Sequence, residues 1–314
     1  MLIDWIAVTL QGDSQQALGL VRSWSGGFED LPGGGNGYDR SAKIWETGRV
    51  FWSSVRPDMG VHVRLPSSAL HASKRDAFDV LGWLLKHNGN ATRLDVACDD
   101  FDYHLLDLAE ISRKAQENEV CTHAHQINEW HALRGVGHTI YFGARSSDRL
   151  LRIYDKAAEQ VANLGGNVEM PDEYWVRVEL ELKGDRAKVA AQMIIDHPEK
   201  WQVLAAGWMR DFVDFKVPDF EDENKARWET CEWWLDFLDN AAKCKIPVKR
   251  EEQTIERIQA WVEKQVTPTL FVLTATVGHD KLFADVGEAS SRLSPRQVQL
   301  INEWNAENGK PDTQ

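Results

Sequence analysis

Apolar and polar residues alternate with a period of two along several segments of the chain, which is the pattern of β-strands that bury one face. In the segment 175–183, valines and leucines fall on one side and charged residues on the other. The turn at residues 145–148 separates two such strands and predicts a hairpin. We therefore expect a mostly antiparallel sheet, with strands at about residues 2–10, 49–55, 60–65, 91–100, 149–156 and 175–183.

A period near 3.6 predicts helices elsewhere. One begins with Ser14 as its cap and ends near residue 24, and a second covers residues 73–87. The glycine-rich run at 26–37 lacks the Gly-Lys-Ser/Thr ending of a P-loop, so it predicts a connecting loop. After Lys183 the pattern becomes helical, with many tryptophans at core spacing. The fold class expected is α+β, with helices flanking the sheet in a domain over 1–200 and a helical domain over 201–314.

Tyrosine and charged residues collect on the polar faces of three predicted strands. Tyr154 shares one face with Arg152 and Lys156. Asp95 lies in the middle of a strand, where aspartate is rare because its short side chain favours turns and caps. If the three strands share a sheet, one surface carries Asp95, Arg152, Tyr154, Lys156, Arg177, Glu179, Glu181 and Lys183.

Asp95 has two interpretations on these grounds. It can pair with an arginine such as Arg93 or Arg177, which is the ordinary structural role of a buried carboxylate. Alternatively, it can join Glu179 and Glu181 as a hard oxygen ligand for Mg²⁺ or Mn²⁺.

Three blocks of the sequence together resemble the replication initiation factor family. They are TRLDVACD at 92–99, IYFGARSSDRLLRIYDK at 140–156 and WVRVELELK at 175–183, in the family's order and spacing. The family includes rolling-circle initiators of small plasmids, related filamentous-phage replication proteins and relaxases of integrative conjugative elements. The resemblance covers the middle third of the chain closely and the N-terminal part loosely.

The resemblance implies a site for nicking and rejoining one DNA strand. It makes Tyr154 the nucleophile, and it makes Asp95, Glu179 and Glu181 ligands of Mg²⁺ or Mn²⁺. A free phenol titrates near pH 10, so a divalent metal and nearby cations would be needed to favour attack on phosphorus. The remaining residues expected to act are Arg152 and Lys156 at the reacting phosphate, Asp99 and Arg177 as supports of the ligands, and Arg145, Arg149 and Lys183 as DNA contacts.

A histidine pair offers another metal site. His123 and His125 match the His-hydrophobe-His pattern by which a strand of other tyrosine endonucleases presents two imidazoles to one metal. We favour the carboxylate set, because the family it resembles carries carboxylates there. His131 and His138 are more typical of surface residues than of ligands.

Composition favours a cytoplasmic protein, and the family resemblance implies a bacterial one. It has 314 residues with 43% hydrophobic composition, and we expect no membrane span and no signal peptide. Its four cysteines show no Cys-x-x-Cys spacing, which indicates reduced thiols rather than a zinc site or disulfide framework.

The net charge of −13 argues against a nonspecific DNA binder, because counterion release needs a basic surface. The charge is uneven, however. Residues 211–239 are acidic, whereas residues 40–75 are net basic. We therefore expect salt-sensitive binding restricted to an origin.

The function expected is initiation of rolling-circle DNA replication through a 5′-phosphotyrosine intermediate. The alternatives are a relaxase of a conjugative or mobilisable element with the same chemistry, a non-catalytic origin-binding protein of the same fold, and a metal phosphodiesterase that uses water. The expected partners are single-stranded or supercoiled origin DNA and a host or element-encoded helicase. The C-terminal helices are expected to contact DNA or to form a homodimer.

Overall fold

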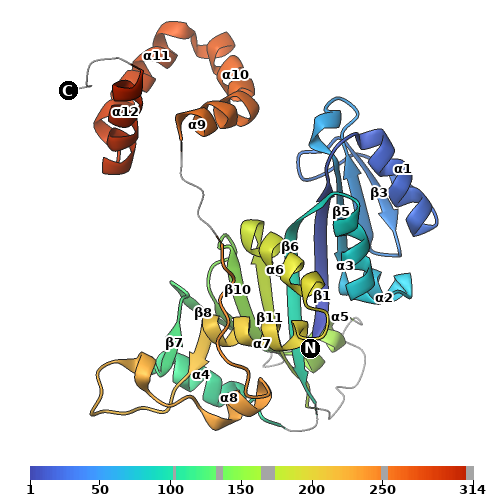
Figure 1. The fold of residues 1–314 in the computed structure, drawn as a ribbon, viewed down its shortest axis with the longest axis vertical. Coiled ribbons are helices and arrows are strands. Elements are labelled where there is room, and N and C mark those ends of the chain that lie inside the picture. Colours follow the sequence, from blue (N-terminus) through green and yellow to red (C-terminus); the bar gives the residue numbers. More distant parts are fainter. Residues whose placement is uncertain (102–103, 132–136, 164–173, 249–253, 309–314) are drawn as a thin grey trace. The chain divides into compact units, whose positions relative to one another are not determined.

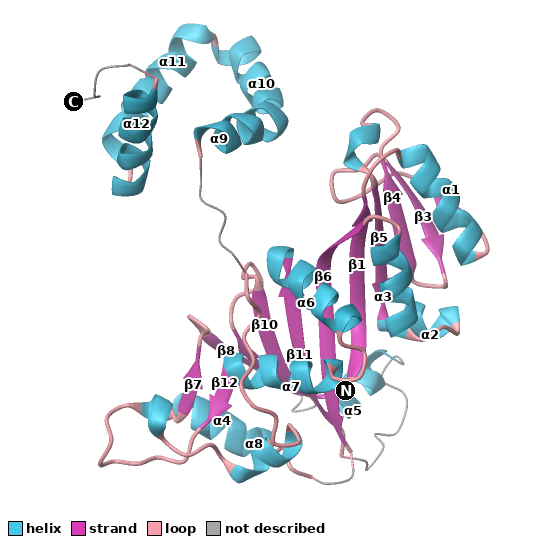
Figure 2. Ribbon diagram, viewed as in Figure 1, coloured by secondary structure: helices cyan, strands magenta, loops and turns pink. Residues whose placement is uncertain are grey.

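The centre of the computed structural model is a ten-stranded antiparallel sheet with the order β2-β3-β4-β5-β1-β6-β11-β10-β9-β8 (Figure 2). The structure describes residues 1–101, 104–131, 137–163, 174–248 and 254–308. A two-stranded sheet of β7 and β12 lies beside the main one. The strands are β1 Leu2–Leu10, β2 Glu29–Leu31, β3 Arg40–Ile44, β4 Gly48–Trp52, β5 Val61–Pro66, β6 Gly89–Asp100, β7 Val120–Thr122, β8 Ile127–His131, β9 His138–Phe142, β10 Arg149–Asp155, β11 Val176–Lys183 and β12 Val213–Phe215.

Helices α3 and α6 lie over one face of this sheet (Figure 1). Alternate residues of the central strands, such as Leu94, Leu180 and Ile153, are fully buried on the apolar face. Ala190 and Ile194 of α6 are buried too, which places the hydrophobic core between α6 and the sheet. The helices around the sheet are α1 Ser14–Ser25, α2 Ser67–Ser73, α3 Ala77–Lys86, α4 Leu108–Gln116, α5 Lys156–Asn163, α6 Gly184–Asp196, α7 Trp201–Phe212 and α8 Glu232–Phe237.

The expected α+β class with an antiparallel sheet is confirmed, and local chemistry explains where element boundaries differ. Asp13, not Ser14, caps α1, since its side chain accepts a hydrogen bond from the backbone of Gln16. The helix expected over 73–87 is two helices, because Lys74 takes a left-handed conformation and Asp76 caps α3. Strands β2, β3, β7 and β8 were not expected from the pattern, and each has five residues or fewer.

Residues 201–248 belong with the sheet and not with the C-terminal helices. The chain divides into two compact units, 1–248 and 249–314, whereas the sequence suggested a division after residue 200. Trp208, Phe215 and Trp234 are at most 1% exposed, and the Phe215 ring meets Phe142 of β9 with ring centres 5.8 Å apart. Of the tryptophans expected in the core, Trp208 and Trp234 fill the core of the first unit, whereas Trp261 of the second unit is 59% exposed.

The second unit is helical. It contains α9 Ile255–Trp261, α10 Thr267–Val277, α11 His279–Glu288 and α12 Pro295–Glu307. Ser294 caps α12 in a capping box with Gln297, and Pro295 occupies the first turn of the helix. Within the described part of the chain, every helix is too short or too polar to cross a bilayer.

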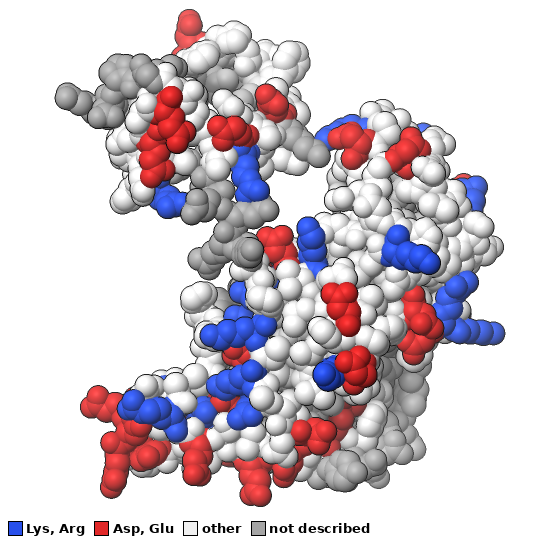
Figure 3. Space-filling model, viewed as in Figure 1, with Lys and Arg blue, Asp and Glu red and all other residues white. Residues whose placement is uncertain are grey.

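Charges of both signs are mixed on the molecular surface that Figure 3 displays. Acidic side chains gather along its lower edge, near α8 and the loop after β12. Asp219, Glu221 and Glu223 of that loop are exposed. The acidic excess expected from residues 211–239 is thus partly a solvated loop.

Candidate active site

The polar face of strands β6, β11 and β10 lies on the side of the sheet opposite α6. The strand register places Tyr154 opposite Arg177 and Arg152 opposite Glu179 on β10 and β11. Between β11 and β6 it places Glu181 opposite Asp95. The structure therefore brings the predicted tyrosine, its arginines and the three carboxylates onto one surface.

Tyr154 is buried on this surface, with only 5% of its area exposed. Its hydroxyl donates a hydrogen bond to Glu179 Oε2 at 3.1 Å. The Lys156 ammonium lies 5.5 Å from the centre of the ring, and the Arg152 guanidinium carbon lies 5.7 Å from it. Burial, followed by the negative charge of Glu179, raises the pKa of Tyr154 above its usual value, while Arg177 and Arg152 oppose the increase. The phenol is therefore neutral in this state.

Glu179 is the proton acceptor nearest to that phenol in the hydrogen-bond network. It is 1% exposed, and its other oxygen accepts a hydrogen bond from Arg152. Burial raises the pKa of Glu179, but Arg152, Tyr154 and Arg177 together outweigh burial and lower it below its usual value. Glu179 is thus an ionised carboxylate held between a phenol and a guanidinium.

Asp95 pairs with Arg93, one of the two partners that the sequence suggested. The Arg93 guanidinium donates to both carboxylate oxygens of Asp95, at 2.9 and 2.6 Å, and contacts Glu181 at 2.7 Å. Asp95 is fully buried, and burial raises its pKa above 3.8 although Arg93 lowers it. Arg93 therefore binds two of the three expected metal ligands at once.

The three carboxylates of this face are chemically suited to bind a hard divalent cation. Asp95 and Glu181 face each other on neighbouring strands, with Glu179 two residues away, and carboxylate oxygens are the ligands that Mg²⁺ and Mn²⁺ prefer. In this structure arginines compensate their charge, so a cation would enter where Arg93 now bridges Asp95 and Glu181. Arg93 has 27% of its side chain exposed and is bordered by solvent.

Arg177 and Asp99 form a separate ion pair at the other end of the face. Arg177 donates to Asp99 at 2.6 and 2.8 Å and to Asp4 of β1 at 2.7 Å. The Trp175 indole also donates to Asp99. Arg177 and Asp99 therefore connect β11, β6 and β1 beside Tyr154.

The three expected DNA contacts lie in different places. Lys183 binds Glu181 and the backbone oxygen of Arg145, near the hairpin turn. Arg149 instead points to the face of α7, where it contacts Asp211 at 3.2 Å and the Phe212 ring. The structure thus brings Arg145 and Lys183 to the polar face and leaves Arg149 on the opposite one.

Two neighbouring cavities open beside Tyr154. One of about 280 Å³ is lined by Tyr154, Arg152 and residues of α5, and it also includes Trp130 and Tyr141. The other, of about 750 Å³, shares Trp130 and Tyr141 and adds polar groups of the β8 and β9 region. Trp130 is 57% exposed although it is a large hydrophobic side chain. The exposed Trp130 ring lines both cavities, and one of these cavities is also lined by Tyr154.

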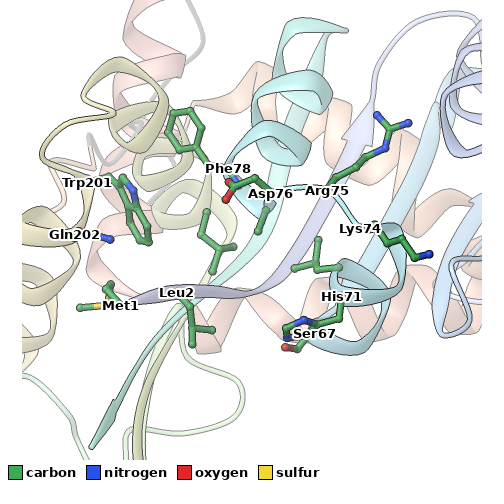
Figure 4. Close-up of a pocket in the computed structure, with 13 residues that line it drawn as sticks. Met1, Leu2, Ser67, His71, Lys74, Arg75, Asp76, Phe78, Trp201 and Gln202 are labelled. Atoms are coloured by element: carbon green, nitrogen blue, oxygen red, sulfur yellow. The ribbon is translucent and has the colours of Figure 1, made fainter.

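A third cavity, of about 540 Å³, lies between the start of β1, α2 and α7 (Figure 4). Figure 4 shows Lys74, Arg75 and Trp201 around it. Arg75 is already engaged, since its guanidinium donates to the Trp24 backbone oxygen at 3.0 Å. None of the residues expected at the reacting site lines this cavity.

Glu129, His131 and His138 form a group that could hold a metal among the described residues, with one ligand atom of each within 4.8 Å of the others. His131 and His138 are cross-strand partners on β8 and β9, and Ser112 of α4 donates to Glu129 at 2.7 Å. In the sequence, the signal for this group is the two-residue spacing of Glu129 and His131, whereas His131 and His138 are expected as surface residues. His123 and His125 follow the end of β7, so the strand expected to present that pair is absent from this described segment.

The structure thus has a buried tyrosine hydrogen-bonded to a carboxylate, beside paired arginines, on the polar face of an antiparallel sheet. The sequence model described as replication initiation factor matches residues 89–283. The chain belongs to the replication initiation factor family.

Individual relatives agree with this assignment. A Bacillus subtilis (strain 168) protein named "Putative DNA relaxase NicK" is 26% identical over 272 residues, covering 82% of this chain and 76% of that protein. A Staphylococcus aureus replication initiation protein is 36% identical over 94 residues, which are 30% of this chain and 26% of that protein. The solved structure of a rolling circle replication initiator protein from Geobacillus stearothermophilus is similar with a TM-score of 0.63 and 26% identity, over 79% of this chain and 98% of that one.

Proposed function

We propose that this chain initiates rolling-circle replication by nicking and rejoining one strand of DNA at an origin, with Tyr154 as the nucleophile. The observation that carries the proposal is the Tyr154 hydroxyl, which donates to the ionised Glu179 at the edge of a cavity lined by Arg152. A solvated sheet face has no need of a buried phenol, a buried carboxylate and a buried guanidinium in one chain of contacts.

In the proposed reaction, the Tyr154 oxygen attacks the phosphorus of one phosphodiester. The bond between that oxygen and phosphorus forms, and the bond between phosphorus and the 3′-oxygen breaks. Glu179 accepts the phenol proton, while the leaving 3′-oxygen takes a proton and becomes a free 3′-OH. Arg152 and Lys156 stabilise negative charge on the phosphate. The 5′-phosphotyrosine retains the bond energy, so the reverse reaction rejoins the strand.

Asp95, Glu179 and Glu181 are the proposed ligands of Mg²⁺ or Mn²⁺. When bound, the cation would supply Lewis-acid stabilisation of charge on the phosphate. The chain's own contribution is to place the carboxylates on adjacent strands and to pair them with Arg93 and Arg152.

Single-stranded DNA is the proposed substrate at the cavities beside Tyr154. Aromatic side chains stack on unpaired bases, and Trp130 and Tyr141 lie between the two cavities. Supercoiling would supply the single-stranded segment at an origin, and a host or element-encoded helicase would extend it after nicking.

A relaxase of a conjugative or mobilisable element is the second candidate. It is favoured by the match with the NicK relative, which covers 82% of this chain. The chemistry at Tyr154 would be the same in both cases, and only the element that carries the cleavage site would differ.

The C-terminal unit is proposed to contact DNA or to form a homodimer. Phe271 and Phe283 are 73% and 70% exposed on its helices. Large exposed hydrophobic side chains favour association, so light scattering of the full chain should show a dimer at micromolar concentration.

The experiment that tests the proposal incubates labelled, origin-bearing supercoiled or single-stranded DNA with the protein and Mn²⁺ or Mg²⁺. With the label in the fragment downstream of the cleaved bond, whose 5′-phosphate joins the tyrosine, we expect a labelled covalent protein–DNA species on denaturing gels, lost in Tyr154→Phe and after chelation. Tyr174→Phe is the matched control, because its hydroxyl contacts Asp100 and Leu106 instead of the site.

The other outcomes identify the alternatives. An adduct retained in Tyr154→Phe would place the nucleophile elsewhere. Cleavage without an adduct would identify a hydrolytic phosphodiesterase, and binding without cleavage would identify a non-catalytic origin-binding protein.

A further inference from the structure

A row of cationic residues crosses the sheet on the same face as Tyr154. In the strand register, Lys183 of β11 lies opposite Arg93 of β6, and Arg93 lies opposite Ala7 of β1. Ala7 in turn lies opposite Arg64 of β5, which lies opposite Arg49 of β4. Four of the five positions in this row are therefore basic, across five neighbouring strands (Figure 2). We call Arg49, Arg64, Arg93 and Lys183 the arginine row.

Aromatic contacts confirm that the arginine row is continuous on one face. The Trp5 ring of β1 lies between two of its members, 4.4 Å from the Arg93 guanidinium and 5.9 Å from that of Arg64. Arg64 also lies 5.4 Å from the Phe51 ring of β4. With strands about 4.8 Å apart, the row extends over about 19 Å from β11 to β4.

The two ends of the arginine row differ in charge compensation. Arg93 and Lys183 bind Asp95 and Glu181, at the candidate active site. Arg49 and Arg64 form no ion pair with any described carboxylate, and they lie directly opposite each other. Like charges at opposed positions of an antiparallel pair are destabilising. Burial, then the charges of Arg49 and Arg93, lower the pKa of Arg64.

This uncompensated pair occurs in a chain of net charge −13, where carboxylates are plentiful. Two like charges that destabilise the fold, and that no carboxylate nearby compensates, are typical of a site that binds a charged ligand. The arginine row begins beside the carboxylates near Tyr154. A ligand that reaches along it from the reacting phosphate must therefore carry several negative charges. The match to the family begins at residue 89, so Arg49 and Arg64 lie outside the segment that defines it.

We propose that Arg49 and Arg64 bind the phosphate backbone of the DNA strand beyond the nicking site and guide it across β6, β1 and β5. This rests on the proposed function, because it takes DNA as the substrate. Ala7 has no long side chain, and the Trp5 ring lies between Arg93 and Arg64 at this point of the row, so a DNA strand that crosses the row passes over an indole flanked by two guanidinium groups. Phosphate contacts of this kind position a strand without reading its sequence.

The test measures binding of fluorescently labelled origin DNA to the full chain by anisotropy, over a series of NaCl concentrations. The variants are Arg49→Gln, Arg64→Gln and the double variant. We expect weaker binding, and a slope of log affinity against log salt that falls by about 0.7 to 0.9 for each arginine removed. Single-stranded and duplex probes compared side by side show which form of the backbone the row contacts.

Thermal unfolding of the same variants separates ligand binding from packing. If Arg64 serves only to cover Trp5 and Phe51, its removal lowers the melting temperature and leaves the salt slope unchanged, which overturns the proposal. If Arg49 and Arg64 bind phosphate, removing one of the two charges leaves the melting temperature equal or higher, while DNA binding weakens.

Arg22→Gln is the control variant. Arg22 is exposed on α1, outside the sheet, with Asp30 at 3.8 Å, and its loss should leave the salt slope unchanged. A wild-type protein that neither binds DNA nor forms the tyrosine adduct would overturn the proposed function itself. If the wild-type protein binds and nicks DNA but the Arg49 and Arg64 variants keep its salt slope, only the proposal for the arginine row is overturned.

Discussion

At the scale of single residues, the polar sheet face is a set of buried charges that neutralise one another in pairs. Glu179 is bound by Arg152, and Asp95 by Arg93. Removing one partner of such a pair leaves an uncompensated buried charge, whereas the intact pair is tolerated. Tyr154 adds a neutral phenol to this network, so its reactivity depends on the charges around it.

His62 on β5 gives a pH prediction at this scale. Burial, followed by the charge of Arg64, lowers the pKa of His62 from 6.5 to about 4. The unfolded chain therefore takes up this proton near pH 6.5 and the folded chain only near pH 4. Between these values the unfolded state binds more protons, so stability falls as the pH falls, by up to about 3 kcal/mol.

Two measurements check this prediction. NMR titration of the His62 ring should give a midpoint near pH 4, moved upward in Arg64→Gln because one cation is removed. Urea denaturation of His62→Gln at pH 7 and pH 4.5 should show a smaller loss of stability than wild type. A midpoint near 6.5 in the native protein would contradict the assignment of the ring to a buried site beside Arg64.

At the scale of elements, β11 shows how a strand can alternate in sequence and still be buried on both faces. Seven of its eight residues are buried, although every second one is charged. The apolar side chains pack under α6, and charged ones pair with residues of opposite charge on β10, β6 and β1. Position in the middle of the sheet, between β6 and β10, therefore decides the environment of this strand.

Helix α7 gives a prediction at the element scale. A Cβ atom on Gly207 would lie 2.6 Å from the Ala242 backbone oxygen and 2.7 Å from Cys244 Cβ. Because the chain crosses the helix here, Gly207→Ala should lower the free energy of unfolding by about 1 to 3 kcal/mol. Chemical denaturation measures this change.

Gly19→Ala in α1 is the matched control, since nothing lies within 4 Å of the Cβ position. Alanine is the better helix former by about 0.5 to 1 kcal/mol, so this variant should be slightly more stable. Equal stability of the two variants would mean that residues 242–244 do not pack on α7.

At the scale of the whole molecule, the first unit needs residues 201–248 to close its core. Trp208 and Trp234 are buried in it, and β12 pairs with β7. A chain of residues 1–248 should therefore unfold in one cooperative transition, whereas residues 1–200 should lack that transition because the large buried rings are missing. Circular dichroism on heating distinguishes them, and equal melting temperatures for the two chains would contradict the boundary at 248.

The sequence predicted which residues share the polar sheet face, but it did not predict several short strands. Alternation placed Tyr154, Arg152 and Glu179 on one face, and strand pairing brought those residues into contact. Alternation also puts Arg149 with Leu151 and Ile153, and the unbroken register of β10 with β11 places it on the face opposite Tyr154. The short strands β2, β3 and β8 were missed, since a run of three to five residues carries little periodicity by which to identify a strand.

The sequence by itself determined the long central strands, the α+β class, the family and the residues on the polar face, because period-two patterning and residue chemistry are local properties. Only the tertiary structure decided that Arg93 bridges Asp95 and Glu181, that Glu129 meets His131 and His138, and that Arg49 faces Arg64. These contacts join residues far apart in the chain through the strand order and register, which depend on the packing of the whole sheet against its helices.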